Sequence, residues 1–106
     1  MSGDHERRRS ERISVSLRAT IEGGPLAGPV EILDVNLHGL FVAATTLPDL
    51  HDRLTFSVEG AGADLWVRGV VVRRLEFGHR VGFGVQLDPG QKAWEAWYLG
   101  FADARG

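Results

Sequence analysis

Arginine side chains are concentrated at the start of the chain, where they could bind a phosphate or a flat base. The first twelve residues read MSGDHERRRSER and hold four arginines: Arg7, Arg8, Arg9 and Arg12. A guanidinium group is a planar fork of N–H donors that pairs bidentately with phosphate or with guanine O6 and N7, and it also stacks on aromatic rings. A run of charges is usually just a solvated arm, so the arginines alone do not define a site.

A second polar group could complete a site for guanine. It comprises Asp34, Asn36 and Gly39 in the segment Asp-Val-Asn-Leu-His-Gly, between two apolar segments. Such turn-forming residues predict a tight connection inside a sheet, with Gly39 at a position of positive φ. Carboxylate and amide oxygens accept hydrogen bonds from the N1–H and N2–H₂ groups of guanine. The arginines and this second group are therefore complementary in what they offer a guanine nucleotide.

Short strands must position both groups. Apolar and polar residues alternate in segments separated by Gly and Pro, and 14 Gly in 106 residues favour one domain with many turns. We expect six strands, at residues 13–22, 30–34, 40–44, 54–59, 65–75 and 81–87. The fifth has apolar residues on both faces, which suits a strand that bends through the closing corner of a barrel at Gly69.

A short helix is expected after the last strand. Four aromatic residues recur there at helical spacings of three and four: Trp94, Trp97, Tyr98 and Phe101. We interpret this stripe mainly as core that packs on the strands, with a partner-binding face as the alternative. The predicted fold is all-β: a small six-stranded antiparallel β-barrel with a C-terminal α-helix at residues 13–106, preceded by a flexible arginine-rich arm at residues 1–12.

Composition and spacing argue against an enzyme. The chain has no Cys, and its four histidines, His5, His38, His51 and His79, lack the paired spacing of a zinc site. No serine lies in a nucleophile-elbow context, and no Gly-rich phosphate loop opens a helix. We therefore expect no metal, no cofactor and no catalytic residue.

Charge and hydropathy also limit which partners and which cellular compartment we expect. The net charge of −2 argues against nucleic acid, because no overall positive field would hold the protein on a polyanion. The polar N-terminus lacks a secretory segment, and no apolar run approaches the ~20 residues that a membrane span requires. We expect a cytoplasmic protein without a membrane span.

The two polar groups together resemble the two-part signature of PilZ domains, which bind the bacterial second messenger cyclic di-GMP. Four segments carry the resemblance: Arg8-x-x-x-Arg12, Asp34-x-Asn36-x-x-Gly39, Gly69-Val-Val and Val81-Gly-Phe-Gly-Val85. The last two are similar to the closing strands of the family. The resemblance covers nearly the whole chain and implies a six-stranded barrel with a terminal helix.

The resemblance also implies roles for the arginines. Arg8 and Arg12 would clamp the phosphates and guanines of cyclic di-GMP from a flexible arm, and Arg7 and Arg9 would assist them. With cyclic di-GMP as a ligand rather than a cofactor, the implied function is that of a receptor or adaptor. Binding would order the arm and change the surface presented to a downstream effector protein, with the chain a monomer or a ligand-linked dimer.

The turn residues have implied roles as well, and one of them departs from the family pattern. Asp34 and Asn36 would hold a guanine edge or a phosphate oxygen, and Gly39 would let the ligand approach the backbone. The family most often has serine where this chain has Asn36, which is bulkier and changes the reach of the side chain.

Two other functions stay open. A PilZ-like domain that does not bind nucleotide could act through protein contacts of the aromatic helix or an exposed barrel edge, and Asn36 favours this alternative. A small barrel could instead bind single-stranded nucleic acid through the arginine arm, although the net charge of −2 weighs against it.

Overall fold

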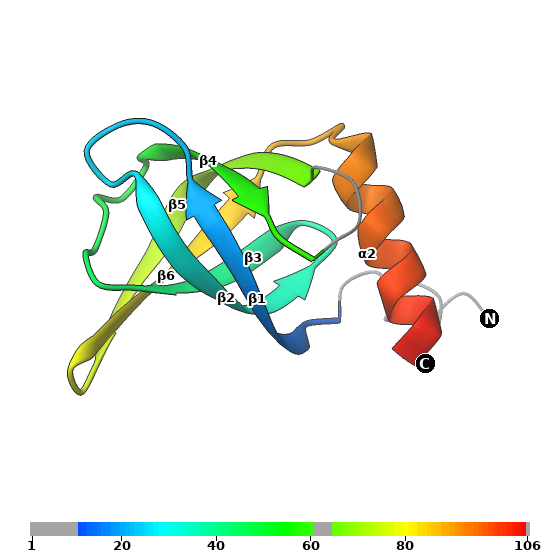
Figure 1. Ribbon diagram of the computed structural model, residues 1–106, viewed down its shortest axis with the longest axis horizontal. Helices are drawn as coiled ribbons and strands as arrows, with labels where there is room; N and C mark the ends of the chain where they lie inside the picture. The colour runs from blue at the N-terminus through cyan, green and yellow to red at the C-terminus, as the bar shows by residue number, and fades with distance from the viewer. Residues whose placement is uncertain (1–10, 61–64, 106) are drawn as a thin grey trace.

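Six strands and one helix make up the described part of the chain. The computed structural model describes residues 11–60 and 65–105. Its elements in chain order are β1 (Ile13–Ile21), β2 (Gly28–Asn36), β3 (Gly39–Ala44), β4 (Arg53–Val58), β5 (Leu65–Phe77), β6 (Arg80–Leu87) and α2 (Lys92–Arg105) (Figure 1). Most of the expected arm, including Arg7, Arg8 and Arg9, lies outside the described residues.

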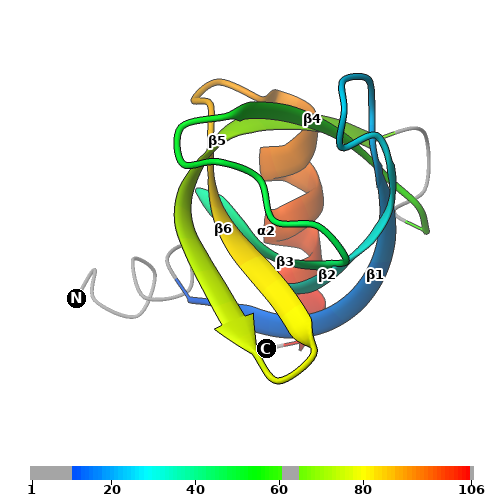
Figure 2. The same ribbon diagram turned by 90° about the vertical axis from the view of Figure 1, so that its left-hand side faces the viewer.

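The strands form a closed antiparallel barrel in the order β1-β2-β3-β6-β5-β4. The ring closes because β1 pairs with β2 along most of its length and with β4 through Ala19, Thr20 and Ile21. Figure 2 shows the barrel seen roughly along its axis, with α2 behind the ring of strands. The predicted six-stranded barrel with a C-terminal helix is confirmed.

Because apolar residues alternate with polar ones, every second side chain of a strand points into the barrel. In β1, Ile13, Ala19 and Ile21 are buried, whereas Ser14, Ser16 and Arg18 are exposed. The barrel interior is filled by branched and aromatic residues from every strand, among them Ile32, Val42, Phe56, Val67 and Phe83. Burial of these side chains is the main force that holds the ring together.

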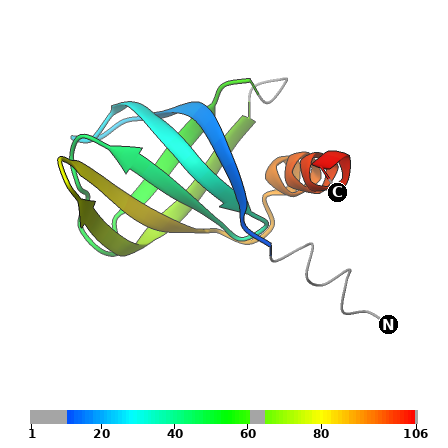
Figure 3. The same cartoon turned by 90° about the horizontal axis from the view of Figure 1, so that it is seen from below.

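Helix α2 covers one end of the barrel and extends the core. Trp94 and Tyr98, one turn apart, are 1% and 0% exposed, and the helix packs against β5 (Figure 3). Trp97 and Phe101 are half-buried, with their rings stacked at a centroid distance of 5.1 Å. The interpretation of the aromatic stripe as core is confirmed for Trp94 and Tyr98. No helix in the described residues is long and apolar enough to cross a bilayer.

The fifth strand differs from the prediction in where it is irregular. The bend was expected at Gly69, but the ladder between β5 and β6 shifts register between Val71 and Arg73. Gly69 is instead a point of close approach, because a Cβ there would collide with the carbonyl oxygen of Gln86. The strand also runs on to Phe77, and its residues from Val72 onward are exposed.

Candidate functional site

The turn between β2 and β3 is held by Asn36 from both its side chain and its backbone. Oδ1 of Asn36 accepts a hydrogen bond of 2.8 Å from the backbone N–H of His38, an arrangement by which Asn commonly stabilises a turn. The carbonyl oxygen of Asn36 accepts a bond of 3.2 Å from Nε1 of Trp94 on α2. Helix α2 therefore helps to hold the β2–β3 turn in place.

Arg12, the residue immediately before β1, reaches toward this turn. Its Nη1 lies 2.6 Å from Oδ1 of Asp34 on β2, in an ion pair whose side chains are 50% and 28% exposed, respectively. Register explains the meeting, because Ile13 and Ser14 of β1 lie opposite Val35 and Asp34 of β2. The pair fixes one edge of the guanidinium group while half of the Arg12 side chain stays accessible.

Gly39 has a different role from the one predicted. Its φ is not positive, so the prediction of a left-handed position is wrong. A Cβ at Gly39 would lie 2.9 Å from the carbonyl oxygen of Val85 on β6 and 3.8 Å from Nη2 of Arg12. Glycine is needed here because β3 lies close against β6, whereas the distance to Arg12 is an ordinary van der Waals contact.

These residues border a hollow of about 330 Å³ on the outer face of β3, β5 and β6. Its lining residues are Arg12, Asn36, His38, Gly39, Val72, Arg73, Gly84, Val85 and Gln86. Two of them, Gly39 and Gly84, are buried glycines of β3 and β6, so the accessible part of the lining comes from side chains around them, such as those of Arg12 and Arg73. The hollow is within the usual size range of small-molecule sites.

Arg73 is a residue of the hollow that the sequence analysis missed. Its guanidinium carbon lies 5.6 Å from the centroid of the Phe41 ring, in cation–π geometry. Arg73 on β5 and Arg12 before β1 both line the hollow. Val71 is buried, so simple alternation would place Arg73 inside as well. The register shift between Val71 and Arg73 pairs Arg73 with Gly84 and turns it outward. The broken alternation of Val70, Val71 and Val72 was the available signal.

A tyrosine on α2 anchors the backbone next to Arg12. The hydroxyl of Tyr98 donates a bond of 2.6 Å to the carbonyl oxygen of Glu11. Burial raises the pKa of Tyr98, and the negative charge of Glu11 raises this pKa further. The phenol therefore stays protonated and able to donate at neutral pH.

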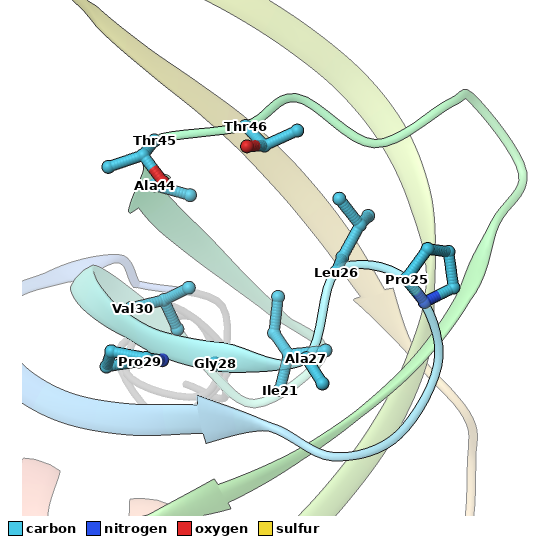
Figure 4. A pocket seen from close by; sticks show the side chains of 10 residues that line it. All are labelled: Ile21, Pro25, Leu26, Ala27, Gly28, Pro29, Val30, Ala44, Thr45 and Thr46. Atoms are coloured by element: carbon cyan, nitrogen blue, oxygen red, sulfur yellow. The ribbon is translucent and has the colours of Figure 1, made fainter.

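A second hollow, of about 240 Å³, lies at the other end of β3. Figure 4 shows that its walls come from the loop between β1 and β2 with the adjoining ends of these strands, and from Ala44 at the end of β3 with Thr45 and Thr46 after it. Its lining side chains are all uncharged, so it offers no cation to pair with a phosphate. In the described ranges, His, Asp and Glu form no group of three or more that could hold a metal ion.

The structure thus brings four predicted site residues together: Arg12, Asp34, Asn36 and Gly39. A sequence model of the PilZ domain matches residues 6–97, a span that includes the arginines and the turn. Comparison with curated proteins finds no match. PilZ domains in general bind cyclic di-GMP and are receptor or adaptor domains. The family match spans most of the chain and agrees with the six-stranded barrel and its terminal helix, so the chain belongs to the PilZ domain family.

Proposed function

We propose that this chain binds cyclic di-GMP in the hollow beside the β2–β3 turn and acts as a receptor or adaptor. The observation that carries the proposal is the placement of Arg12, paired with Asp34, at a hollow that Arg73 also lines. Two accessible guanidinium groups at one hollow suit a ligand that combines phosphates with flat bases.

Arg12 and Asp34 act as a unit in this proposal. Asp34 holds Nη1 of Arg12, while Nη2 lies toward Gly39 and the hollow. A guanidinium group has five N–H donors, so the fork donates to Asp34 and to a phosphate or guanine at the same time. Asp34 thereby orients Arg12 before the ligand arrives, which reduces the entropy lost on binding.

Other arginines complete the cation set. Arg73 borders the hollow from β5, and its planar group over Phe41 offers a surface on which a guanine stacks. Arg8 in the arm, assisted by Arg7 and Arg9, supplies further donors to the phosphates in the proposal. Binding then orders the arm against the barrel and alters the surface presented to an effector protein.

Asn36 has mainly a structural part in the proposal. Its Oδ1 already accepts the N–H of His38, and this bond holds the turn that borders the hollow. A serine hydroxyl supports a turn of this kind in a similar but weaker way. The replacement of the family's usual serine by Asn36 is therefore compatible with ligand binding.

Isothermal titration with cyclic di-GMP tests the proposal, with GTP and cyclic di-AMP as controls. We expect micromolar or tighter binding for cyclic di-GMP alone. The variant Arg12→Ala should lose at least about tenfold in affinity, because a charge-assisted bond to phosphate or guanine is removed. Arg18→Ala is the matched control: Arg18 is also an exposed arginine, on β1, but it does not line the hollow, so its removal should leave the affinity unchanged.

Two results would contradict the proposal. One is normal binding by Arg12→Ala, and the other is the absence of binding by a folded wild-type chain. The second result would favour an adaptor that acts through protein contacts alone. The exposed Trp66 of β5, 53% accessible, is the observation that supports that alternative.

A further inference from the structure

The outer edge of β5 is unpaired over residues 72–77 in the described part of the chain. β4 pairs with β5 only from Leu65 to Val70, and Asp52 and His51 extend this pairing to Val71. Beyond Val71, described residues pair with β5 only from the β6 side. We call the other side of residues 72–77 the free edge. An unpaired edge of this kind is a template for another strand.

The free edge is accessible. The β5–β6 hairpin projects from the barrel at the end opposite α2 (Figures 1 and 3). All six residues of the free edge are exposed, and they include large apolar side chains: Val72 is 48%, Leu75 43% and Phe77 39% exposed. A second strand can therefore approach this edge without displacing the barrel.

The hydrogen-bonding phase of the free edge follows from the hairpin turn. Phe77 and Arg80 are paired on either side of a two-residue turn, so they exchange both backbone hydrogen bonds. Bonded and non-bonded pairs alternate along an antiparallel ladder. The backbone N–H and C=O groups of Arg74 and Glu76 therefore point away from β6, toward the free edge.

The side chains divide between two faces. Arg74 and Glu76 lie on one face because side chains alternate along a strand. Arg73, Leu75 and Phe77 lie on the other, where a Cβ added at Gly82 would be 3.0 Å from the Phe77 ring. One face of the free edge thus carries a cation and an anion two residues apart, and the other face carries apolar groups beside an arginine.

We propose that the free edge pairs with the free edge of a second copy of this chain, antiparallel and centred on Leu75. A two-fold axis normal to the sheet relates the two strands and keeps each face on its own side. Centring on Leu75 places Arg74 opposite Glu76 of the second copy, and Glu76 opposite Arg74 of the second copy. Both are pairs whose backbone groups point at each other, and both join opposite charges.

Charge excludes the neighbouring registers. Centring on Arg74 would place two arginines directly opposite each other, and centring on Glu76 would place two glutamates opposite each other, which is unfavourable in a sheet. On the other face, the Leu75 register brings Leu75 against Leu75 and Arg73 against Phe77 of the second copy, a cation–π pair. The sequence of the free edge is therefore self-complementary in one register.

Sedimentation velocity of the full chain without any ligand tests this pairing. It does not depend on the proposed nucleotide binding, so the two proposals fail separately. We expect a reversible dimer with a Kd on the order of 100 µM, weak because the paired segment is short. Arg74→Glu and Glu76→Arg should each weaken the dimer about tenfold or more, because each turns two attractive pairs into repulsive ones.

Restoring the charge pattern should restore the dimer. An equal mixture of Arg74→Glu and Glu76→Arg forms two attractive pairs across the axis, and the double variant R74E/E76R does so with itself. Arg68→Glu is the matched control, because Arg68 is an exposed residue of β5 whose position is paired with Thr55 of β4. It should dimerise as the wild type does. Circular dichroism of each variant verifies that the barrel is folded.

Amide hydrogen exchange locates the contact. In the dimer, the amides of Arg74 and Glu76 should exchange more slowly than in the Arg74→Glu monomer, while the amide of Leu75, already turned toward β6, should change little. The proposal is overturned by a wild type that stays monomeric up to about 1 mM. Dimerisation of the single variants at wild-type strength, or no rescue in the mixture and in the double variant, also overturns it.

Discussion

At the scale of single residues, close approach of backbones determines what the site tolerates. Gly39 leaves no room for a methyl group, because the carbonyl oxygen of Val85 would lie 2.9 Å from it. That oxygen belongs to the backbone of β6, so it moves only if the ladder between β3 and β6 moves. The glycine therefore sets the stability of the ladder between β3 and β6.

Gly39→Ala should lower the free energy of unfolding by about 1–3 kcal/mol, the usual cost of forcing extra volume into a packed position. Urea unfolding measures this change. Gly100→Ala is the control: an added Cβ on α2 meets nothing within 4 Å, and alanine favours a helix by about 0.5–1 kcal/mol. A Gly39→Ala variant as stable as the wild type would show that the strands yield without strain.

At the scale of elements, α2 holds both segments of the site. Trp94 bonds the carbonyl of Asn36 in the turn, and Tyr98 bonds the carbonyl of Glu11, next to Arg12. Both side chains are almost fully buried, so the helix ties the start of β1 to the β2–β3 turn through the core. The helix at the end of the barrel thereby positions a site on the outer face of the barrel.

Tyr98→Phe tests this anchoring through its pH dependence. The folded chain raises the pKa of Tyr98 above its ordinary value, so unfolding releases a proton in alkaline solution. The stability that the neutral phenol contributes is present below about pH 10, the pKa of an unfolded tyrosine, and is lost as the pH rises toward the raised value. Unfolding midpoints between neutral pH and pH 11 should fall for the wild type and fall less for Tyr98→Phe.

At neutral pH the same variant should be less stable by about 1 kcal/mol, the typical net value of one hydrogen bond. It should also bind cyclic di-GMP more weakly, because the backbone beside Arg12 is no longer tied to α2. Phe101→Leu alters packing on the same helix without touching that hydrogen bond. Equal alkaline profiles for the wild type and Tyr98→Phe would contradict the anchoring role.

At the scale of the whole molecule, ligand binding should stabilise the folded barrel. The proposed ligand contacts Arg12, the β2–β3 turn, β5 and β6 together, and this surface exists only in the folded chain. Cyclic di-GMP at about 100 times its Kd should therefore add about 2.7 kcal/mol of stability. For a domain of this size, that raises the melting temperature by about 10 °C or more.

Thermal unfolding with and without the ligand measures this shift. The control variant Arg18→Ala should shift as the wild type does, whereas Arg12→Ala should shift much less at the same ligand concentration. An equal shift in Arg12→Ala would indicate binding elsewhere on the barrel, for instance in the uncharged hollow at the end of β3.

The strands, the barrel and the meeting of Arg12 with the β2–β3 turn could be predicted from local sequence patterns. Alternation with period two marks buried and exposed positions in β1, and the spacing of three and four marks Trp94 and Tyr98 as helix core. These patterns are local, so they can be read without knowing which strands are neighbours. The approach of Arg12 to Asp34 and Asn36 likewise agrees with the residue types and their spacing.

The remaining features could not be predicted from local patterns, because they depend on pairing between distant segments. The register shift after Val71 turns Arg73 outward to the hollow, contrary to simple alternation. Gly39 is required by contact with Val85, which lies on a strand distant in sequence, rather than by its own backbone angles. The free edge exists because β4 ends its pairing at Val70 while β5 continues to Phe77. Register and strand length are set by packing across the whole barrel, and a local pattern does not contain them.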